Sequence, residues 1–253
     1  MRAAKGKDLT ALVTGGSRGI GRAVCLRLAA EGAGTVVVNY LENDIEAERT
    51  GKLIEERSSA CVLAKANLLH SAEVDRLFLI VKEAVGQLDV FVHCAAVTAF
   101  KPLRDIRSNQ WDLTMNVNTR SFLLCVQKCV PLMQDGKGKI VAISSLGSSR
   151  AIPNYGALGP TKAALEATVR YLAVELAPAG IRVNAVSGGF VQTDSTRKVP
   201  GADILAEKTA ARTPAGCLGT PDDIAGVVLF LLSPSASWIY GQTIVADGGL
   251  SLV

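Results

Sequence analysis

The stretch ALVTGGSRGIGRAV, residues 11–24, decides the fold of this 253-residue chain. Its first residues are apolar or β-branched, as in a buried strand, and its last residues begin an amphipathic, helix-like run. Between them lie Gly15, Gly19 and Gly21. These glycines permit a tight turn and let the backbone approach a pyrophosphate, which the amide groups at a helix N-terminus then bind. The stretch therefore predicts a dinucleotide site at the first turn between a strand and a helix.

The same alternation of strand and helix continues along the chain. Six further apolar runs read as strands, at residues 35–40, 61–66, 88–94, 139–144, 181–187 and 243–249, and helix-like segments separate them, including a long helix over 109–133 and another over 162–176. Continuous apolar strands that alternate with helices predict a parallel sheet covered on both faces. We therefore expect an α/β fold with a doubly wound sheet of about seven strands, forming a single domain over residues 1–253.

One segment lacks such a pattern. Residues 194–216, DSTRKVPGADILAEKTAARTPAG, follow the predicted strand 181–187 and should lie at the carboxyl edge of the sheet, where open α/β sheets bind ligands. We interpret this segment as a substrate lid. Its basic residues suit either a phosphate group or an acidic partner, or serve only solubility; they are Arg197, Lys198, Lys208 and Arg212.

Composition excludes several classes of function. The net charge of +4 is too small to indicate nucleic-acid binding. No run of eighteen apolar residues predicts a membrane span, and the N-terminus lacks the apolar region of a signal peptide. The six cysteines have no metal-ligand spacing, so we expect no metal site and a reduced, cytoplasmic protein.

The glycine loop, Thr14-Gly15 followed by Gly19 and Gly21, resembles the TGxxxGxG loop of the short-chain dehydrogenase/reductase superfamily, and the resemblance extends over essentially the whole chain. It implies a Rossmann-like fold and a nicotinamide cofactor. The residues at matching cofactor-binding positions are Gly15, Ser17, Arg18, Gly19, Ile20, Gly21, Asn39, Asn67, Ala95, Lys162, Gly189 and Thr193. His93 stands where the superfamily has an asparagine, and we expect it to be buried and structural rather than catalytic.

The choice of cofactor depends on the end of the second strand. NAD-specific members place an acid there, which accepts from the ribose 2′-hydroxyl. This chain has Asn39 instead, and Arg18 is available to a 2′-phosphate. Glu42 and Asp44 follow closely and oppose a phosphate. We expect NADPH, with NADH the less favoured cofactor.

The catalytic positions differ from those of the carbonyl-reducing members, which carry Asn, Ser and Tyr-x-x-x-Lys. Asn118, Ser145 and Lys162 match that set, but Leu158 fills the tyrosine position. Tyr155 stands seven residues before Lys162, and Pro160 between them is tolerated only near a helix start. Tyr155 should therefore precede the first turn, displaced by about one turn, roughly 4.5 Å, from the usual position.

A displaced tyrosine suits conjugate reduction, in which hydride lands two carbons away from the oxygen that gains negative charge. The Tyr-x6-Lys spacing resembles the NADPH-dependent enoyl-[acyl-carrier-protein] reductases of the superfamily, most closely the type III bacterial group. The resemblance implies that Tyr155 binds the thioester oxygen and that Lys162 binds the nicotinamide ribose. It implies an enoyl thioester substrate, on acyl carrier protein or CoA, in fatty-acid or related biosynthesis. It also implies a homotetramer or homodimer.

Several alternatives stay open at this point. Ser145 and Asn118 either take a direct catalytic part or only satisfy backbone groups. The protein is otherwise a ketoreductase with a displaced tyrosine, an enoyl reductase of specialised metabolism, or a non-catalytic dinucleotide-binding regulator. Retention of Tyr155, Lys162, Ser145 and Asn118 together argues against the regulator, since binding alone needs no such set.

Overall fold

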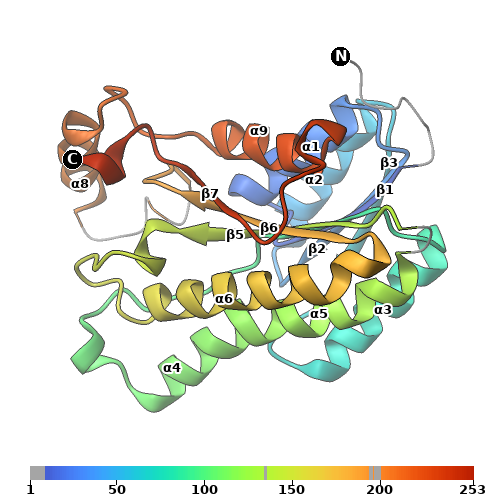
Figure 1. Ribbon diagram of the computed structural model, residues 1–253, viewed down its shortest axis with the longest axis horizontal. Coiled ribbons are helices and arrows are strands. Elements are labelled where there is room, and N and C mark those ends of the chain that lie inside the picture. The colour runs from blue at the N-terminus through green and yellow to red at the C-terminus, as the bar shows by residue number, and fades with distance from the viewer. Residues whose placement is uncertain (1–8, 134–135, 194–195, 197–200) are drawn as a thin grey trace.

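A computed structural model describes residues 9–133, 136–193, 196 and 201–253 of the chain. Its centre is a seven-stranded parallel sheet with strand order β3-β2-β1-β4-β5-β6-β7 (Figure 1). The strands are β1 (Thr10–Thr14), β2 (Thr35–Tyr40), β3 (Ala60–Lys65), β4 (Val90–His93), β5 (Lys139–Ser145), β6 (Arg182–Gly188) and β7 (Thr243–Ala246). The predicted Rossmann-like, doubly wound sheet is confirmed.

The position of β1 fixes where a ligand can bind. This strand pairs with β2 on one side and β4 on the other, so the order of the strands reverses at β1. In sheets of this kind ligands bind outside the carboxyl ends of the strands at the point of reversal. The glycine loop, residues 15–21, follows β1 directly and therefore occupies that point.

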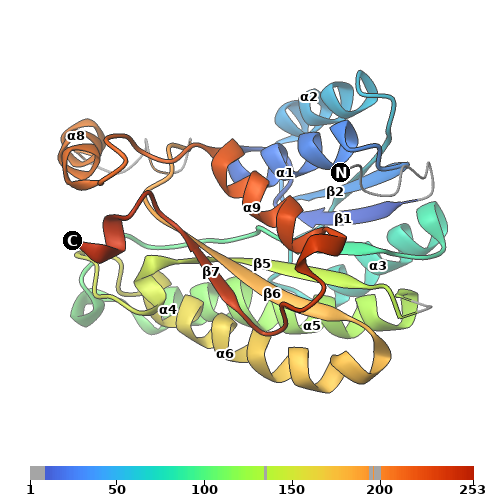
Figure 2. The same ribbon diagram turned by 45° about the horizontal axis from the view of Figure 1, so that its top comes forward.

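Helices cover both faces of the sheet. Figure 2 shows α1 (Gly19–Ala30), α2 (Asp44–Glu55) and α9 (Pro221–Leu232) on one face, and α3 (Ser71–Val85), α4 (Ser108–Met115), α5 (Ser121–Cys129) and α6 (Leu158–Leu176) on the other. Each face has its own buried aliphatic cluster, one centred on α1 and α9 and one on α3, α5 and α6. Burial of these apolar stripes against the strands holds the loops at the carboxyl edge in place.

The predicted single helix over 109–133 is wrong in detail. The structure divides it into α4, a π-helical turn at Asn116–Arg120, α5, and a short 3-10 turn at Val130–Leu132. The π turn carries Asn118, which is fully buried. The side chain of Asn118 bonds the backbone of Val97 on the segment after β4, and a π turn adds the extra residue that lets one position of a helix face inward.

The predicted lid is described in part. Its main element is α8 (Ala202–Arg212), which projects from the body of the molecule beside the carboxyl ends of the strands (Figure 2). Two of the basic residues of the predicted lid, Arg197 and Lys198, lie outside the described residues. The remaining short 3-10 turns are Leu103–Asp105, Leu146–Ser148, Ala177–Ala179, Pro234–Ala236 and Leu250–Leu252.

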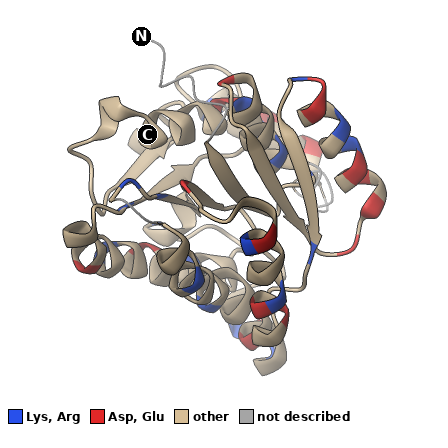
Figure 3. Ribbon diagram, turned by 90° about the vertical axis from the view of Figure 1, so that its right-hand side faces the viewer, with Lys and Arg blue, Asp and Glu red and all other residues tan. Residues whose placement is uncertain are grey.

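Charged residues of both signs lie interspersed on the helices (Figure 3). Such mixing fits the small net charge of +4. In the part of the chain that the structure describes, no helix has the length and apolar character needed to cross a membrane. Within the same residues, no cluster of three or more potential metal ligands occurs.

Candidate active site

The glycine loop packs too tightly for any side chain at two of its positions. Gly15 has a φ of +64°, and a Cβ there would lie 3.0 Å from the backbone of Ala95. A Cβ on Gly21 would lie 2.2 Å from the carbonyl oxygen of Gly15. The loop is therefore folded back onto the start of α1, where free amide groups and the helix dipole favour a phosphate. This arrangement fits the pyrophosphate of a dinucleotide.

Further predicted cofactor residues surround the loop. A Cβ on Gly19 would lie 3.6 Å from the methyl group of Thr193, so Thr193 stands directly over the loop, beside a hollow of about 290 Å³. Gly189 is wedged at the end of β6, where a Cβ would meet Asp247 at 2.8 Å. The carbonyl oxygen of Ser17 accepts from the Thr50 hydroxyl at 3.0 Å. Ile20 is half-buried and packs against the core cluster around α1.

The side-chain nitrogen of Asn39, at the end of β2, is bonded to the neighbouring strand. Asn39 is 2% exposed, and its side-chain amide donates to the carbonyl oxygens of Ala64 and Ala66 at 3.1 and 3.2 Å. The carboxylate of Asp44, which would oppose a 2′-phosphate, is paired with Lys65 at 2.9 Å. Hence Asn39 acts on the neighbouring strand, and the charge of Asp44 is largely compensated.

Two other predicted cofactor residues, Arg18 and Asn67, lie outside the first turn of the glycine loop. Arg18 is the N-cap of α1 and is exposed. The pKa of Glu46 is lowered chiefly by a hydrogen bond from Arg22, and the charge of Arg18 adds a small further lowering. Asn67 follows β3, and its side-chain oxygen accepts from the amide of Leu69 at 3.0 Å. This bond orients the side chain of Asn67 at the carboxyl edge of the sheet.

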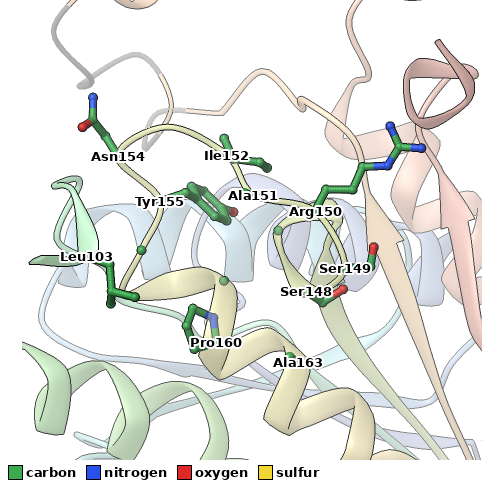
Figure 4. A pocket seen from close by; sticks show the side chains of 13 residues that line it. Leu103, Ser148, Ser149, Arg150, Ala151, Ile152, Asn154, Tyr155, Pro160 and Ala163 are labelled. Atoms are coloured by element: carbon green, nitrogen blue, oxygen red, sulfur yellow. The ribbon is translucent and has the colours of Figure 1, made fainter.

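Tyr155 and Lys162 each hydrogen-bond a residue in the last part of β5. The Tyr155 hydroxyl lies 3.0 Å from the Ser145 hydroxyl, and the Lys162 ammonium donates to the carbonyl oxygen of Ile143 at 2.6 Å. Helix α6 begins at Leu158, so Tyr155 precedes it, as the position of Pro160 predicts. Figure 4 shows Tyr155 between the loop after β5 and the start of α6, beside a cavity of about 470 Å³. Ser145 and Lys162 do not line this cavity, which lies beside the ring of Tyr155.

The side chain of Asn118 hydrogen-bonds two separate segments of the chain. Its side-chain oxygen accepts from the amide of Val97 at 2.8 Å, and its nitrogen donates to the carbonyl of Val97 at 2.9 Å. The same nitrogen lies 3.1 Å from the hydroxyl of Thr161, the residue before Lys162. Asn118 thus ties the segment after β4 to the first turn of α6, and it positions Lys162 through the backbone.

Comparison with known proteins shows the family to which the chain belongs. The family model described as Enoyl-(Acyl carrier protein) reductase matches residues 15–251. The chain belongs to the short-chain dehydrogenase/reductase superfamily. A short-chain dehydrogenase/reductase of known structure from Serratia marcescens superposes with a TM-score of 0.90 at 30% identity, covering 96% of this chain and 98% of that one. The chain is therefore an oxidoreductase of a superfamily that binds nicotinamide dinucleotides.

Curated relatives of this superfamily member differ in reaction. A 1-cyclohexenylcarbonyl-CoA reductase from Streptomyces collinus is 44% identical over 248 residues, covering 96% of this chain and 86% of the relative. The 3-oxoacyl-[acyl-carrier-protein] reductase FabG of Staphylococcus aureus strain Mu50 is 35% identical over 242 residues, covering 95% and 97%. Membership of the superfamily is therefore compatible with reduction of a C=C bond and with reduction of a C=O bond. The chemistry of the site distinguishes the two reactions.

Burial shifts the acid–base properties of the oxidoreductase's central pair. Lys162 is 4% exposed, and burial lowers its pKa to about 8, although Cys94 and Glu166 act in the opposite direction. Burial raises the pKa of Tyr155, and the hydrogen bond with Ser145 partly opposes that shift. At neutral pH the phenol of Tyr155 therefore keeps its proton and Lys162 is mostly charged. The Lys162 ammonium loses its proton as the pH rises through about 8.

His93 is buried and structural, as expected from the sequence. The Thr14 hydroxyl accepts from the amide of Cys94 at 3.2 Å and lies 3.0 Å from Nδ1 of His93. The amide of Ala95 also donates to this hydroxyl, at 3.4 Å, and two accepted bonds leave the hydroxyl hydrogen free to point at Nδ1, which favours the tautomer with the proton on Nε2. Burial, helped by the charge of Lys162, lowers the pKa of His93 to about 3.

The shift of His93 predicts acid sensitivity. With a folded pKa of about 3 and an ordinary unfolded value of 6.5, the unfolded state binds the extra proton between these pH values, so stability falls as pH falls. The free energy of unfolding should drop by about 1.4 kcal/mol per pH unit, or roughly 2 kcal/mol from pH 6.5 to pH 5. Urea titrations at both pH values measure it. In His93→Asn this loss should disappear; an equal loss in both proteins would contradict the assignment.

Three further residues pack at the site without belonging to any of the motifs above. Ser144 donates to the carboxylate of Glu166, which lies one helical turn after Lys162. The third is Gly147, which contacts the ring of Tyr155. The sequence could have indicated Glu166, because its spacing of four residues from Lys162 places both side chains on one face of a helix. No pattern marks Gly147, because its role depends on a contact with a residue eight positions away in a loop.

Proposed function

We propose that this oxidoreductase reduces the carbon–carbon double bond of an enoyl thioester with NADPH. The observation that carries the proposal is the place of the phenol. Tyr155 precedes α6 and meets Ser145, while Leu158, 8% exposed, occupies the position nearer Lys162 where carbonyl reducers hold their acid. An apolar side chain there cannot protonate a carbonyl oxygen bonded to the carbon that accepts hydride.

The reaction fits this displacement. A nicotinamide dinucleotide with its pyrophosphate held by the glycine loop would supply the hydride. Addition of that hydride to the β-carbon pushes the C=C electron pair toward the thioester, and negative charge develops on the carbonyl oxygen two carbons away. Tyr155 donates a hydrogen bond to that oxygen and so stabilises the enolate. A proton from solvent then adds to the α-carbon, which completes the saturated thioester.

Lys162 has two tasks in this scheme. Its buried ammonium donates to the carbonyl of Ile143 on β5. In the proposed complex it would also hold the ribose hydroxyls of the nicotinamide half of the cofactor. Its positive charge also favours negative charge on a nearby oxygen, and low polarity around a buried group strengthens the effect. Asn118 acts through Thr161, and Ser145 keeps the phenol oriented.

The relative from Streptomyces collinus supports the substrate class. Its name specifies an unsaturated acyl group conjugated to a CoA thioester, and its identity to this chain, 44%, exceeds the 35% of the 3-oxoacyl reductase. A CoA or carrier-protein thioester is accordingly the proposed substrate. Assembly into a homotetramer or homodimer is part of the proposal; Tyr171 and Val174 on α6 are 74% and 77% exposed, and they offer apolar surface for such contacts.

A cofactor-oxidation assay tests the proposal. NADPH consumption is followed at 340 nm with crotonyl-CoA, 1-cyclohexenylcarbonyl-CoA and acetoacetyl-CoA, each with the acyl carrier protein thioester as a parallel series. Turnover of the two enoyl thioesters with little turnover of acetoacetyl-CoA supports the assignment. Preferential turnover of acetoacetyl-CoA would establish the 3-ketoacyl reductase instead, and turnover of neither class would refute both.

Arg18 should determine the preference for NADPH over NADH. Its guanidinium stands at the N-terminus of α1, while Asn39 is turned toward β3 and offers no carboxylate to a ribose hydroxyl. Loss of a charge-assisted hydrogen bond of about 1.5–3 kcal/mol corresponds to a rise in KM of roughly tenfold to a hundredfold. We expect Arg18→Ala to show this rise for NADPH and none for NADH. Arg57→Ala, at the far end of α2, is the control; equal losses for both cofactors would contradict a role in phosphate recognition.

A further inference from the structure

We infer that Gly147 is a positioning residue that sets the place of the Tyr155 hydroxyl by leaving room for the edge of its ring. The inference rests on the proposed role of Tyr155 in enoyl reduction. Gly147 lies in the short 3-10 turn Leu146–Ser148 directly after β5, two residues beyond Ser145. It has an ordinary negative φ, so backbone conformation does not require a glycine there.

The requirement for glycine comes from the ring itself. A Cβ on Gly147 would lie 2.6 Å from both Cδ1 and Cε1 of Tyr155, closer than carbon atoms in contact can approach. The side chain of Tyr155 therefore rests with its edge against the bare Cα of Gly147. Phe100 flanks the ring with a centroid separation of 6.1 Å and an interplanar angle of 44°. The ring is held between these two residues.

Gly147 has no freedom to move away from the ring. A Cβ on Gly159 would lie 2.7 Å from the carbonyl oxygen of Gly147, so the first turn of α6 packs directly on the backbone of residue 147. The amide of Gly159 in turn donates to the carbonyl of Tyr155 at 2.9 Å. Both partners of the contact are thus tied to the same helix start. A methyl group at position 147 has to be accommodated by the ring of Tyr155.

A cavity beside Tyr155 can accept a displaced ring. The cavity of about 470 Å³ in Figure 4 is lined by both Gly147 and Tyr155, together with Leu103, Pro160 and Ala163. A displaced ring can enter this space without unfolding the helix. The hydroxyl then leaves the Ser145 hydroxyl, now at 3.0 Å, and no longer points to the place where the thioester oxygen gains charge. Misplacement of a catalytic group by about 1 Å lowers the rate by up to roughly a hundredfold.

The test compares Gly147→Ala, Tyr155→Phe and the double variant. We expect Gly147→Ala to lower kcat for an enoyl thioester by about 10-fold to 100-fold, with KM for NADPH unchanged. In the Tyr155→Phe background the same substitution should change kcat by less than about twofold, because the hydroxyl that it misplaces is already absent. Gly226→Ala on α9, where a Cβ meets nothing within 4 Å, is the matched control and should leave kcat unchanged.

A crystal structure of Gly147→Ala gives a readout independent of activity. The hydroxyl of Tyr155 should lie beyond hydrogen-bond distance from Ser145. An unmoved phenol, or an equal fall in kcat with and without the Tyr155 hydroxyl, would overturn the inference. Failure of the proposed function is a separate result: wild-type protein would then not turn over enoyl thioesters, while the position of the phenol in the variant would still decide the role of Gly147.

Discussion

Replacing Tyr155 by phenylalanine should lower kcat for an enoyl thioester by about 10²–10³-fold and leave KM for NADPH within about twofold. The phenol is half-buried, keeps its proton through neutral pH and stands beside Ser145 at the end of β5. Its hydroxyl helps only where charge develops, so its loss affects the transition state more than the bound ground state. Phenylalanine preserves the ring contacts with Gly147 and Phe100.

Steady-state kinetics with crotonyl-CoA and NADPH measure the effect. The matched control is Tyr171→Phe, which removes the same hydroxyl from an exposed tyrosine on α6. Its kcat should equal that of the wild type. An unchanged kcat in Tyr155→Phe would remove the phenol from the mechanism, and another donor would then have to meet the thioester oxygen.

The second large effect is expected from Lys162→Met. Methionine approximates the length and packing of the lysine stem but removes a buried charge that donates to the carbonyl of Ile143. Without the ammonium, the ribose of the cofactor loses a donor and the enolate loses a nearby positive charge. We expect kcat/KM to fall by about 10²-fold or more, with a higher KM for NADPH as well as a lower kcat. This split distinguishes Lys162 from Tyr155.

The charge of Lys162 also predicts a pH profile. Because burial lowers its pKa to about 8, the free enzyme loses the ammonium as pH rises through 8, so kcat/KM should be level below pH 7 and fall about tenfold per unit above 8. The residual activity of Lys162→Met should lack this inflection. Lys82→Met, at an exposed position of α3, should keep the wild-type profile. A level profile to pH 10 in the wild type would show that the titration of Lys162 does not control the rate.

Local patterns were sufficient for the sheet and the nucleotide loop. Apolar runs separated by amphipathic helices predict parallel strands covered on both faces, and the structure has seven of them. The glycine spacing predicts a loop folded onto a helix start, and Gly15 and Gly21 are packed in that way. The position of Tyr155 before α6 also follows locally, because Pro160 confines the start of the helix.

The roles of Asn118 and Gly147 could not follow from local patterns. Asn118 bonds Val97, twenty-one residues earlier, and it does so from a π turn in a segment whose apolar pattern indicates one continuous helix. Gly147 owes its importance to the edge of the Tyr155 ring, and Asn39 faces β3 because two carbonyl oxygens there need a donor. Residue order and periodicity specify which elements form, since those depend on neighbours within a few positions. The direction of each polar side chain depends on atoms that folding brings together from distant segments. The hydrogen-bond partners within the site were therefore decided by the tertiary structure.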